Sequence, residues 1–248
     1  ALRLASDGAR VAVFDIDAEG AERVAAELRA LGADAVAGRV DVTSADSCER
    51  MIETVVQAFG RLDAMFCNAG IAQVKPFMDI SVAEWDATFA VNTKGVFLTM
   101  QAAARAMQAQ APLVPNRLKG KIIVTASIGG RYGSSPSAVV IPHYRASKAA
   151  VISLTQSAAV ALAPHISVNA ICPGMVDTDM GLSIKSAWAQ LRASQSDETT
   201  AACSFNAVLL GRAQTPQDVA CVAAFLAGAN ADFMTGQSLN VDGGVSMN

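Results

Sequence analysis

The sequence has few of the side chains that metal sites and serine-type catalytic triads need. Its 248 residues include two histidines, His143 and His165, so imidazole chemistry is poorly supplied. The cysteines are odd in number and form no Cys-x-x-Cys pair; they are Cys48, Cys67, Cys172, Cys203 and Cys221. Such a scattered set disfavours a disulfide framework or a zinc site and is typical of a reducing compartment. We therefore expect a cytoplasmic protein without a bound metal.

Charge and long apolar runs are also scarce. Charged residues make up 17% of the chain, the net charge is −3, and no run of lysine or arginine occurs. Nothing here indicates a partner such as nucleic acid or anionic lipid. The helical stretch 149–163 is interrupted by Ser153, Thr155, Gln156 and Ser157, and no apolar run reaches membrane-spanning length. The expected partners are small molecules, not nucleic acid or a membrane.

Apolar residues account for 52% of the chain and are organised as short runs between longer, alanine-rich helical patterns. This alternation predicts a parallel sheet, because parallel strands are buried on both faces and read as continuous apolar runs. We expect strands at 11–14, 36–40, 64–66, 122–125, 166–171 and 238–241. The fold class is therefore α/β, a doubly wound parallel sheet of Rossmann type. No linker divides residues 1–248, and the least regular region, 177–206, is expected to be a lid over the site.

The first residues look like the end of an element. Residues 1–6 have the pattern of the last turns of a helix, Asp7 and Gly8 supply its stop, and the first strand begins at Val11. We expect that the sequence given is a truncated form of a longer chain, in which another strand comes first.

Tyr144 and Lys148 are the most informative pair in the chain. They are four residues apart on a predicted helix, so the phenol and the ammonium share one face. A fixed positive charge stabilises phenolate and is expected to lower the tyrosine pKa from about 10 towards working pH. Such a base can take a proton from an alcohol. An isolated pair of this kind is common on amphipathic helices, so the rest of the chain has to support this interpretation.

The motifs that support it occur in a fixed order: Asn68-Ala69-Gly70, Asn92, Ser127, Tyr144, Lys148 and Pro173-Gly174. With this order, essentially the whole chain resembles the short-chain dehydrogenase/reductase family. The resemblance implies hydride transfer between NAD and a secondary alcohol or ketone, with Tyr144 as the acid/base. It also implies that Lys148 tunes Tyr144 and holds the nicotinamide ribose, that Ser127 polarises the substrate oxygen, and that Asn92 supports a water relay. Thr125 is the nearest hydroxyl rival to Ser127.

Two departures from the family pattern matter. The glycine-rich Thr-Gly-x-x-x-Gly-x-Gly turn, which should cradle the pyrophosphate after a first strand, does not occur. The interval between Ser127 and Tyr144 is also longer than is usual in the family. Residues 133–141 are expected to carry this extra length beside the substrate.

Asp15 ends the first predicted strand, where the Rossmann-type pattern places a carboxylate on the adenosine ribose. It should repel a 2′-phosphate, and Ile16 supplies no competing arginine, so NAD is favoured over NADP. The alternatives are a solvated strand-end aspartate, or Asp17 in the same role.

The remaining cofactor residues are implied by the resemblance. Asp41 and Val42 correspond to the pair that holds adenine, although Asp41 is also a candidate helix cap. Asn68, Ala69 and Gly70 follow the fourth family strand, where small residues let the backbone approach the cofactor, with a plain turn as the alternative. The loop after residue 171 should bind the nicotinamide amide; its candidate residues are Pro173, Gly174, Val176 and Thr178.

The substrate signal is weaker. The segments 234–237 and 240–244 and the loop after Pro173 are similar to those of polyol and diol dehydrogenases. The rivals are a 3-oxoacyl thioester reductase that uses NADPH, which Asp15 and the sparse basic residues disfavour, and a catalytically silent dinucleotide-binding protein. Alanine-rich helices around 99–107 and 146–162 permit close packing, and with the family resemblance they predict a homotetramer.

Overall fold

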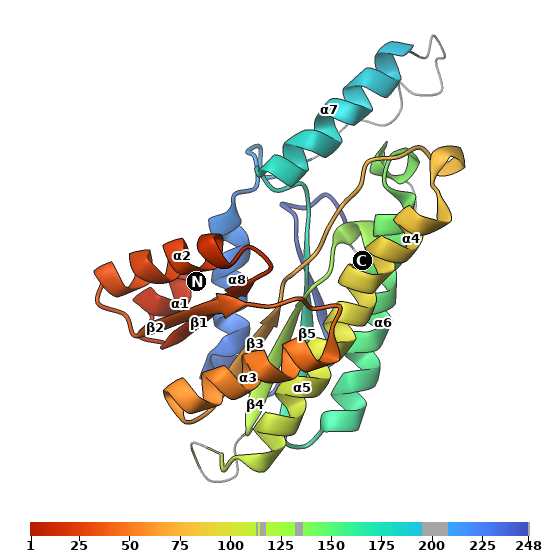
Figure 1. Ribbon diagram of the computed structural model, residues 1–248. Helices are drawn as coiled ribbons and strands as arrows, with labels where there is room; N and C mark the ends of the chain where they lie inside the picture. The colour runs from red at the N-terminus through yellow and green to blue at the C-terminus, as the bar shows by residue number, and fades with distance from the viewer. Residues whose placement is uncertain (113, 115–117, 132–135, 195–207, 248) are drawn as a thin grey trace.

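The computed structural model describes the chain except for residues 113, 115–117, 132–135, 195–207 and 248. Its strands are all parallel and lie between two layers of helices (Figure 1). They are β1 Val11–Asp15, β2 Ala35–Arg39, β3 Ala64–Cys67, β4 Gly120–Thr125, β5 Ile166–Pro173 and β6 Ser238–Val241. Each overlaps a strand expected from the sequence, and the doubly wound α/β class is confirmed.

The strands form two sheets. One has the order β1-β2 and the other β3-β4-β5-β6, so the hydrogen-bonded ladder is interrupted between β1 and β3. On one side of this interruption the strand order runs from β1 to β2, and on the other side it runs from β3 to β6. The carboxyl ends of strands at such a switch point form the usual ligand crevice of open α/β sheets.

Strand side chains alternate between two apolar layers, as the pleat requires. In β4, Ile122 and Val124 pack with α3 Ala45–Phe59, α5 Val96–Ala109 and α6 Pro142–Leu162, whereas Ile123 packs against α8 Pro216–Ala227 on the other face. Both layers use buried β-branched side chains. A smaller cluster joins β1 and β2 to α2 Ala18–Ala30 and to α1 Leu2–Ser6.

Local sequence sets the helix starts. Asp17, Ser44, Ser81 and Thr215 accept hydrogen bonds from backbone N–H groups in the first turns of α2, α3, α4 Val82–Phe89 and α8. The Ser81 and Thr215 caps are reciprocal capping boxes with Glu84 and Asp218. The short helical turns are η1 Phe77–Asp79, η2 Ala90–Gly95, η3 Ile128–Gly130, η4 Pro136–Val139 and η6 Ala229–Ala231.

Two expectations about irregular segments have different outcomes. Of residues 1–6, Leu2–Ser6 do form a short helix, α1, which is followed by Gly8 in the left-handed region at φ 86°. The expectation that 177–206 is irregular is wrong for the first part of this segment, because α7 Asp179–Ser194 is a regular helix. It lies beyond the carboxyl ends of the strands (Figure 1). The rest of that region, 195–206, is outside the described residues.

Within the described part of the chain, no helix is long and apolar enough to cross a membrane. Cys48, Cys67, Cys172 and Cys221 are free thiols. Cys203 is outside the described residues.

Candidate active site

Helix α6 places Tyr144 and Lys148 together. Pro142 is tolerated in its first turn, where a backbone N–H has no helical partner. Lys148 is 3% exposed, and its Nζ donates a hydrogen bond of 2.6 Å to the Thr125 carbonyl at the end of β4. The same ammonium lies 5.6 Å from the centroid of the Tyr144 ring. The two side chains share one face of the helix, as their spacing predicts.

Ser127 reaches the same place from β4. Its Oγ accepts a hydrogen bond of 3.0 Å from Gly129 N in η3, and it is hydrogen-bonded to the Tyr144 side chain. The rival Thr125 hydroxyl instead donates to Asn68 Oδ1 at 3.0 Å. The hydroxyl beside the phenol is therefore that of Ser127.

Asn92 lies in a distorted helix. The turn η2 is a π-helix, a form that is rare and occurs mostly at functional sites. The buried Asn92 amide accepts from Ile71 N at 2.8 Å and donates to Ile71 O at 2.9 Å and to Ser147 Oγ at 3.0 Å. Ser147 Oγ in turn donates to the Tyr144 carbonyl at 2.6 Å. Asn92 thus joins the loop after β3 to the helix that carries Tyr144.

Two glycines allow these segments to pack closely, because a side chain at either position would meet close neighbours. A methyl group on Gly70 would lie 3.3 Å from Asn92 Oδ1 and 3.5 Å from Lys148 Nζ. On Gly130 it would lie 2.6 Å from Ala149 N, so η3 rests directly on the backbone of α6. Ser147 and Gly130 were not identified from the sequence. The available signal for Ser147 was a small polar residue between Tyr144 and Lys148 in an alanine-rich helix.

Burial dominates the titration of the pair. It raises the pKa of Tyr144 above its usual value, and the Ser127 hydrogen bond offsets part of that rise. Burial also lowers the pKa of Lys148 to about 8. The expectation that Lys148 lowers the Tyr144 pKa is therefore wrong. The ammonium is directed to the Thr125 carbonyl and lies over the ring face, so it does little to stabilise a phenolate oxygen.

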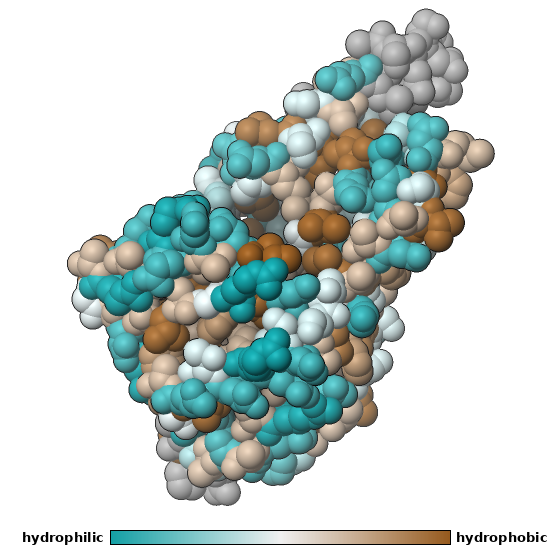
Figure 2. Space-filling model, in the orientation of Figure 1, coloured by the Kyte–Doolittle hydropathy of each residue, from teal (hydrophilic) through white to brown (hydrophobic). Residues whose placement is uncertain are grey.

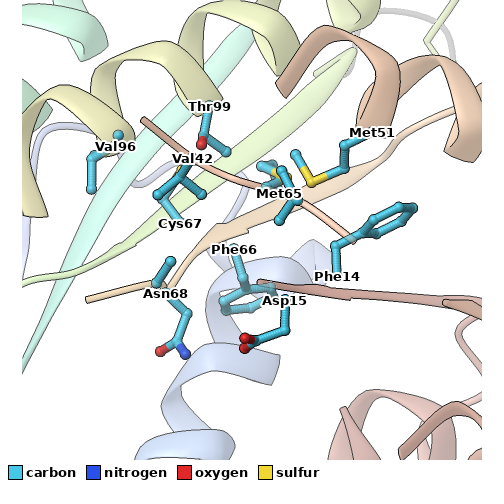
Figure 3. A pocket seen from close by; sticks show the side chains of 13 residues that line it. Phe14, Asp15, Val42, Met51, Met65, Phe66, Cys67, Asn68, Val96 and Thr99 are labelled. Carbon is cyan, nitrogen blue, oxygen red and sulfur yellow. The ribbon is translucent and has the colours of Figure 1, made fainter. Parts of the chain in front are cut away.

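A pocket lies at the switch point between the two sheets (Figure 3). Four of the expected cofactor residues line it, namely Asp15, Val42, Asn68 and Ala69. Gly95 allows close packing in the lining of this pocket, because a methyl group there would lie 2.7 Å from Val42 Cγ2. The strand ends of β1 and β3 thus bring together residues that are far apart in the sequence.

The structure distinguishes the three neighbouring aspartates. Asp17 caps α2 through Gly20 N at 3.0 Å, whereas Asp15 lines the pocket and accepts from Asp17 N at 3.0 Å. Asp41 is not a lining residue. Its carboxylate accepts from the backbone and hydroxyl of Thr43, and these hydrogen bonds lower its pKa. Since Ser44 caps α3, the cap considered for Asp41 is wrong.

The residues expected to meet the nicotinamide amide follow β5. Pro173 is its last residue, and Gly174 N donates to Val241 O and to Gln214 Oε1, both at 3.0 Å. A methyl group on Gly174 would lie 3.0 Å from Asp242 Cβ. Val176 forms a bridge with Gln214, and Thr178 Oγ1 accepts from Gly181 N at 3.2 Å in the first turn of α7. This group does not line the switch-point pocket.

The residues present fit a dinucleotide. The Asp15 carboxylate and the apolar Val42 lie in a crevice at the switch point, and a methyl group on Gly70, the residue after Ala69 of its lining, would lie 3.5 Å from Lys148 Nζ. Such a cofactor needs a polar contact for its ribose, an apolar surface for its flat base, and space for its reacting end beside the two hydroxyls.

Of the insertion expected at 133–141, residues 133–135 are outside the described part. Val140 and Ile141 are buried and pack with Tyr144. His143 is also buried, and its ring nitrogens have no hydrogen-bond partner among the described residues.

The fold and site define a Rossmann-type α/β protein with a crevice at the switch point between its two sheets. A family model described as enoyl-(acyl carrier protein) reductase matches residues 1–246. Galactitol 2-dehydrogenase of Agrobacterium fabrum is 38% identical, over 97% of this chain and 89% of that protein.

Two solved structures are similar over nearly their full length. A short-chain type dehydrogenase/reductase from Mycobacterium marinum has a TM-score of 0.85 at 35% identity, over 100% of this chain and 90% of that one. NAD⁺-bound xylitol dehydrogenase has a TM-score of 0.82 at 31% identity, over 98% and 92%. The chain belongs to the short-chain dehydrogenase/reductase family and is an oxidoreductase of that family.

The buried ammonium generates the first prediction, which concerns Lys148→Met and stability. Below pH 8 Lys148 is charged in both the folded and the unfolded chain, so the burial cost is fully present. Between the folded pKa of about 8 and the reference 10.5 this cost disappears, and it corresponds to about 3 kcal/mol. The free energy of unfolding of the parent protein should therefore rise by about 3 kcal/mol relative to that of Lys148→Met as pH rises through this window. Urea unfolding at several pH values measures the difference.

Lys94→Met is the matched control, because Lys94 is exposed and has no such burial cost. A constant stability difference between Lys148→Met and the parent from pH 7 to pH 10.5 would contradict the prediction.

Proposed function

We propose that this protein catalyses reversible hydride transfer between NAD and a secondary alcohol or its ketone. The observation that carries the proposal is the Ser127 hydroxyl beside the Tyr144 phenol, with the Lys148 ammonium one helical turn away. Bound NAD supplies the hydride chemistry. Its adenosine half, and the part that leads from there to the nicotinamide ring, would be held by Asp15, Val42, Asn68, Ala69 and Gly70. Asp41, Lys148, Pro173, Gly174, Val176 and Thr178 are assigned to it by the family pattern.

Tyr144 is assigned as the acid/base. A pKa held above its usual value keeps the phenol protonated at neutral pH, so it is ready to donate its proton to a carbonyl oxygen during ketone reduction. Ser127 donates a hydrogen bond to the same oxygen and stabilises charge that develops on it. Lys148, with a pKa of about 8, keeps a positive charge beside them at neutral pH. Asn92 holds the surrounding backbone, and we assign the water relay to it.

The substrate class expected from the sequence was a polyol or a diol. Among the relatives of this chain, names include sorbitol dehydrogenase, L-2,3-butanediol dehydrogenase and cyclopentanol dehydrogenase, at 38%, 35% and 36% identity. All three names denote oxidation of an alcohol. A 3-oxoacyl-[acyl-carrier-protein] reductase is 32% identical. We keep an NADPH-dependent thioester reductase as the alternative, and Asp15 is the observation against it.

Tyr144→Phe tests the central assignment. It removes the titrating oxygen and keeps the ring, so turnover should fall by roughly 10²–10⁴-fold while the Kd for NAD stays near the parent value. Stopped-flow rates and NAD titration measure the two quantities. Near-parent turnover in this variant would show that another group is the acid/base. A parent protein that binds NAD but turns over no alcohol or ketone would support the silent dinucleotide-binding alternative.

The cofactor preference rests on Asp15. The parent should have a higher kcat/KM with NAD than with NADP, and Asp15→Ala should reduce that preference by at least tenfold, because a carboxylate repels the 2′-phosphate. Asp17→Ala is the matched control. It removes the cap of α2, so it should cost about 1 kcal/mol of stability and leave the preference unchanged. A parent preference for NADP would count against Asp15 and favour the thioester reductase.

We also propose a cytoplasmic homotetramer. Helix α6 leaves Val160 82% exposed, and α5 leaves Phe97 44% exposed, which offers apolar contacts between subunits. The free thiols of the described cysteines agree with a reducing compartment. Sedimentation at micromolar concentration should give a mass four times that of the chain, and a monomer would refute the assembly.

A further inference from the structure

The side chain of Gln214 lies at the point where β5 and β6 end. The two strands are paired as far as Pro173 and Val241, which are their last residues. Gln214 is 7% exposed, and its amide bonds both chains: Oε1 accepts from Gly174 N at 3.0 Å, and Nε2 donates to Val241 O at 2.5 Å. One neutral amide can do this because it has both an acceptor and a donor. The side chain therefore adds a connection between β5 and β6 where their ladder stops.

The backbone of Gln214 holds the next part of the same loop. Asp177 N donates to the Gln214 carbonyl at 2.8 Å, and Val176 pairs with Gln214 in a parallel bridge. The side chain thus bonds the beginning of the loop 174–177, and the backbone bonds its end. A single residue, far away in the sequence, fixes the whole of this short loop.

Gln214 is itself part of a firmly bonded segment. Arg212 and Asp218 form a two-point ion pair with distances of 2.7 and 2.6 Å. Asp218 also completes the capping box with Thr215 at the start of α8. Such bidentate pairs fix geometry even where water screens their charge. Residues 212–218 are therefore a well-defined support for the loop.

The loop packs closely against this support. A methyl group on Gly174 would lie 3.0 Å from Gln214 Oε1 and 3.0 Å from Asp242 Cβ. The loop leads from the carboxyl end of β5 to α7 (Figure 1), and the space-filling view shows a hollow in the surface below α7 (Figure 2). Ligands of open α/β sheets bind at the carboxyl ends of the strands. The loop that Gln214 holds is thus placed where a ligand would meet it.

We propose that Gln214 is a positioning residue for the nicotinamide end of the cofactor. The inference rests on the proposed function, in which Gly174, Val176 and Thr178 meet the nicotinamide amide. Gln214 fixes the loop that carries these groups, and through the loop it sets the orientation of the ring relative to Tyr144. It does this without contact to the reacting atoms.

The adenosine half of the cofactor does not depend on Gln214. Asp15 and Val42 line the switch-point pocket, and Gln214 is not a lining residue of that pocket. The proposal therefore has a specific signature. Loss of the Gln214 amide should weaken binding of NADH but not binding of ADP-ribose, which has every part of NADH except the nicotinamide ring.

Gln214→Met tests this difference. Methionine has a similar length but lacks both the acceptor and the donor, so the loop loses its side-chain connection. The Kd for NADH should rise by about tenfold, and the Kd for ADP-ribose should stay within about twofold of the parent value. With NAD, kcat should fall by at least about tenfold, because a misplaced ring is far from the reactive geometry. Calorimetric titration and steady-state kinetics measure these quantities.

Gln110→Met is the matched control. The Gln110 amide also bonds backbone groups, since it accepts from Leu62 N at 3.1 Å and donates to Leu62 O at 2.7 Å and to Lys119 O at 2.6 Å. Leu62 and Lys119 precede β3 and β4, so they lie at the opposite ends of the strands. This variant should lose stability and keep the parent ratio of the two Kd values. An equal change of the ratio in both variants overturns the inference.

Hydrogen exchange gives a readout without any cofactor. In Gln214→Met the amides of residues 174–178 should exchange faster than in the parent, and those of β4 should not change. Unchanged exchange at 174–178 overturns the inference. If Gln214→Met folds poorly, Gly174→Ala makes the same tests from the side of the loop, because its methyl group crowds Gln214 Oε1.

Two results distinguish the inference from the proposed function. If the parent binds NADH and turns over an alcohol, but Gln214→Met keeps the parent ratio of the Kd values, the inference is overturned and the proposed function stands. If the parent binds neither NADH nor ADP-ribose, the proposed function is overturned and the inference fails with it.

Discussion

The hydrogen bonds of the Asn92 amide are the interaction on which the rest of the site depends. One side chain satisfies both the N–H and the carbonyl of Ile71 and still donates to Ser147. The loop after β3, the π-helical turn and α6 therefore have fixed positions relative to one another. A buried amide with all of its bonds made is rigid, because losing any one of them would leave a polar group unpaired away from water. Lys148 and Tyr144 take their positions from this framework.

The buried ammonium adds a second constraint. A lysine this far from water is tolerated because the Thr125 carbonyl accepts from it at 2.6 Å. The same carbonyl belongs to β4, whose next residues lead to Ser127. The strand thus holds the charge and also delivers the hydroxyl. Gly130 completes the arrangement, since any side chain there would separate η3 from the backbone of α6.

Sequence reasoning recovered what short-range patterns encode. The strands were recognisable because parallel strands are buried on both faces, and Tyr144 and Lys148 because one helical turn fixes their spacing. The contribution of Ser147 was missed because its partner Asn92 lies 55 residues away. Helix α7 was missed because its periodicity is weak; its apolar face packs on loops and not on the sheet. The predicted direction of the Tyr144 pKa shift was wrong because burial by distant segments raises this pKa by more than the Ser127 hydrogen bond lowers it.

The interrupted ladder between β1 and β3 separates two parts of the site. Asp15 is carried by the two-stranded sheet, whereas Asn68, Ser127 and the α6 residues belong to the four-stranded sheet. A ligand that contacts both Asp15 and the residues of α6 would span the two sheets, so recognition of the cofactor would be coupled to alignment of the groups beside Tyr144.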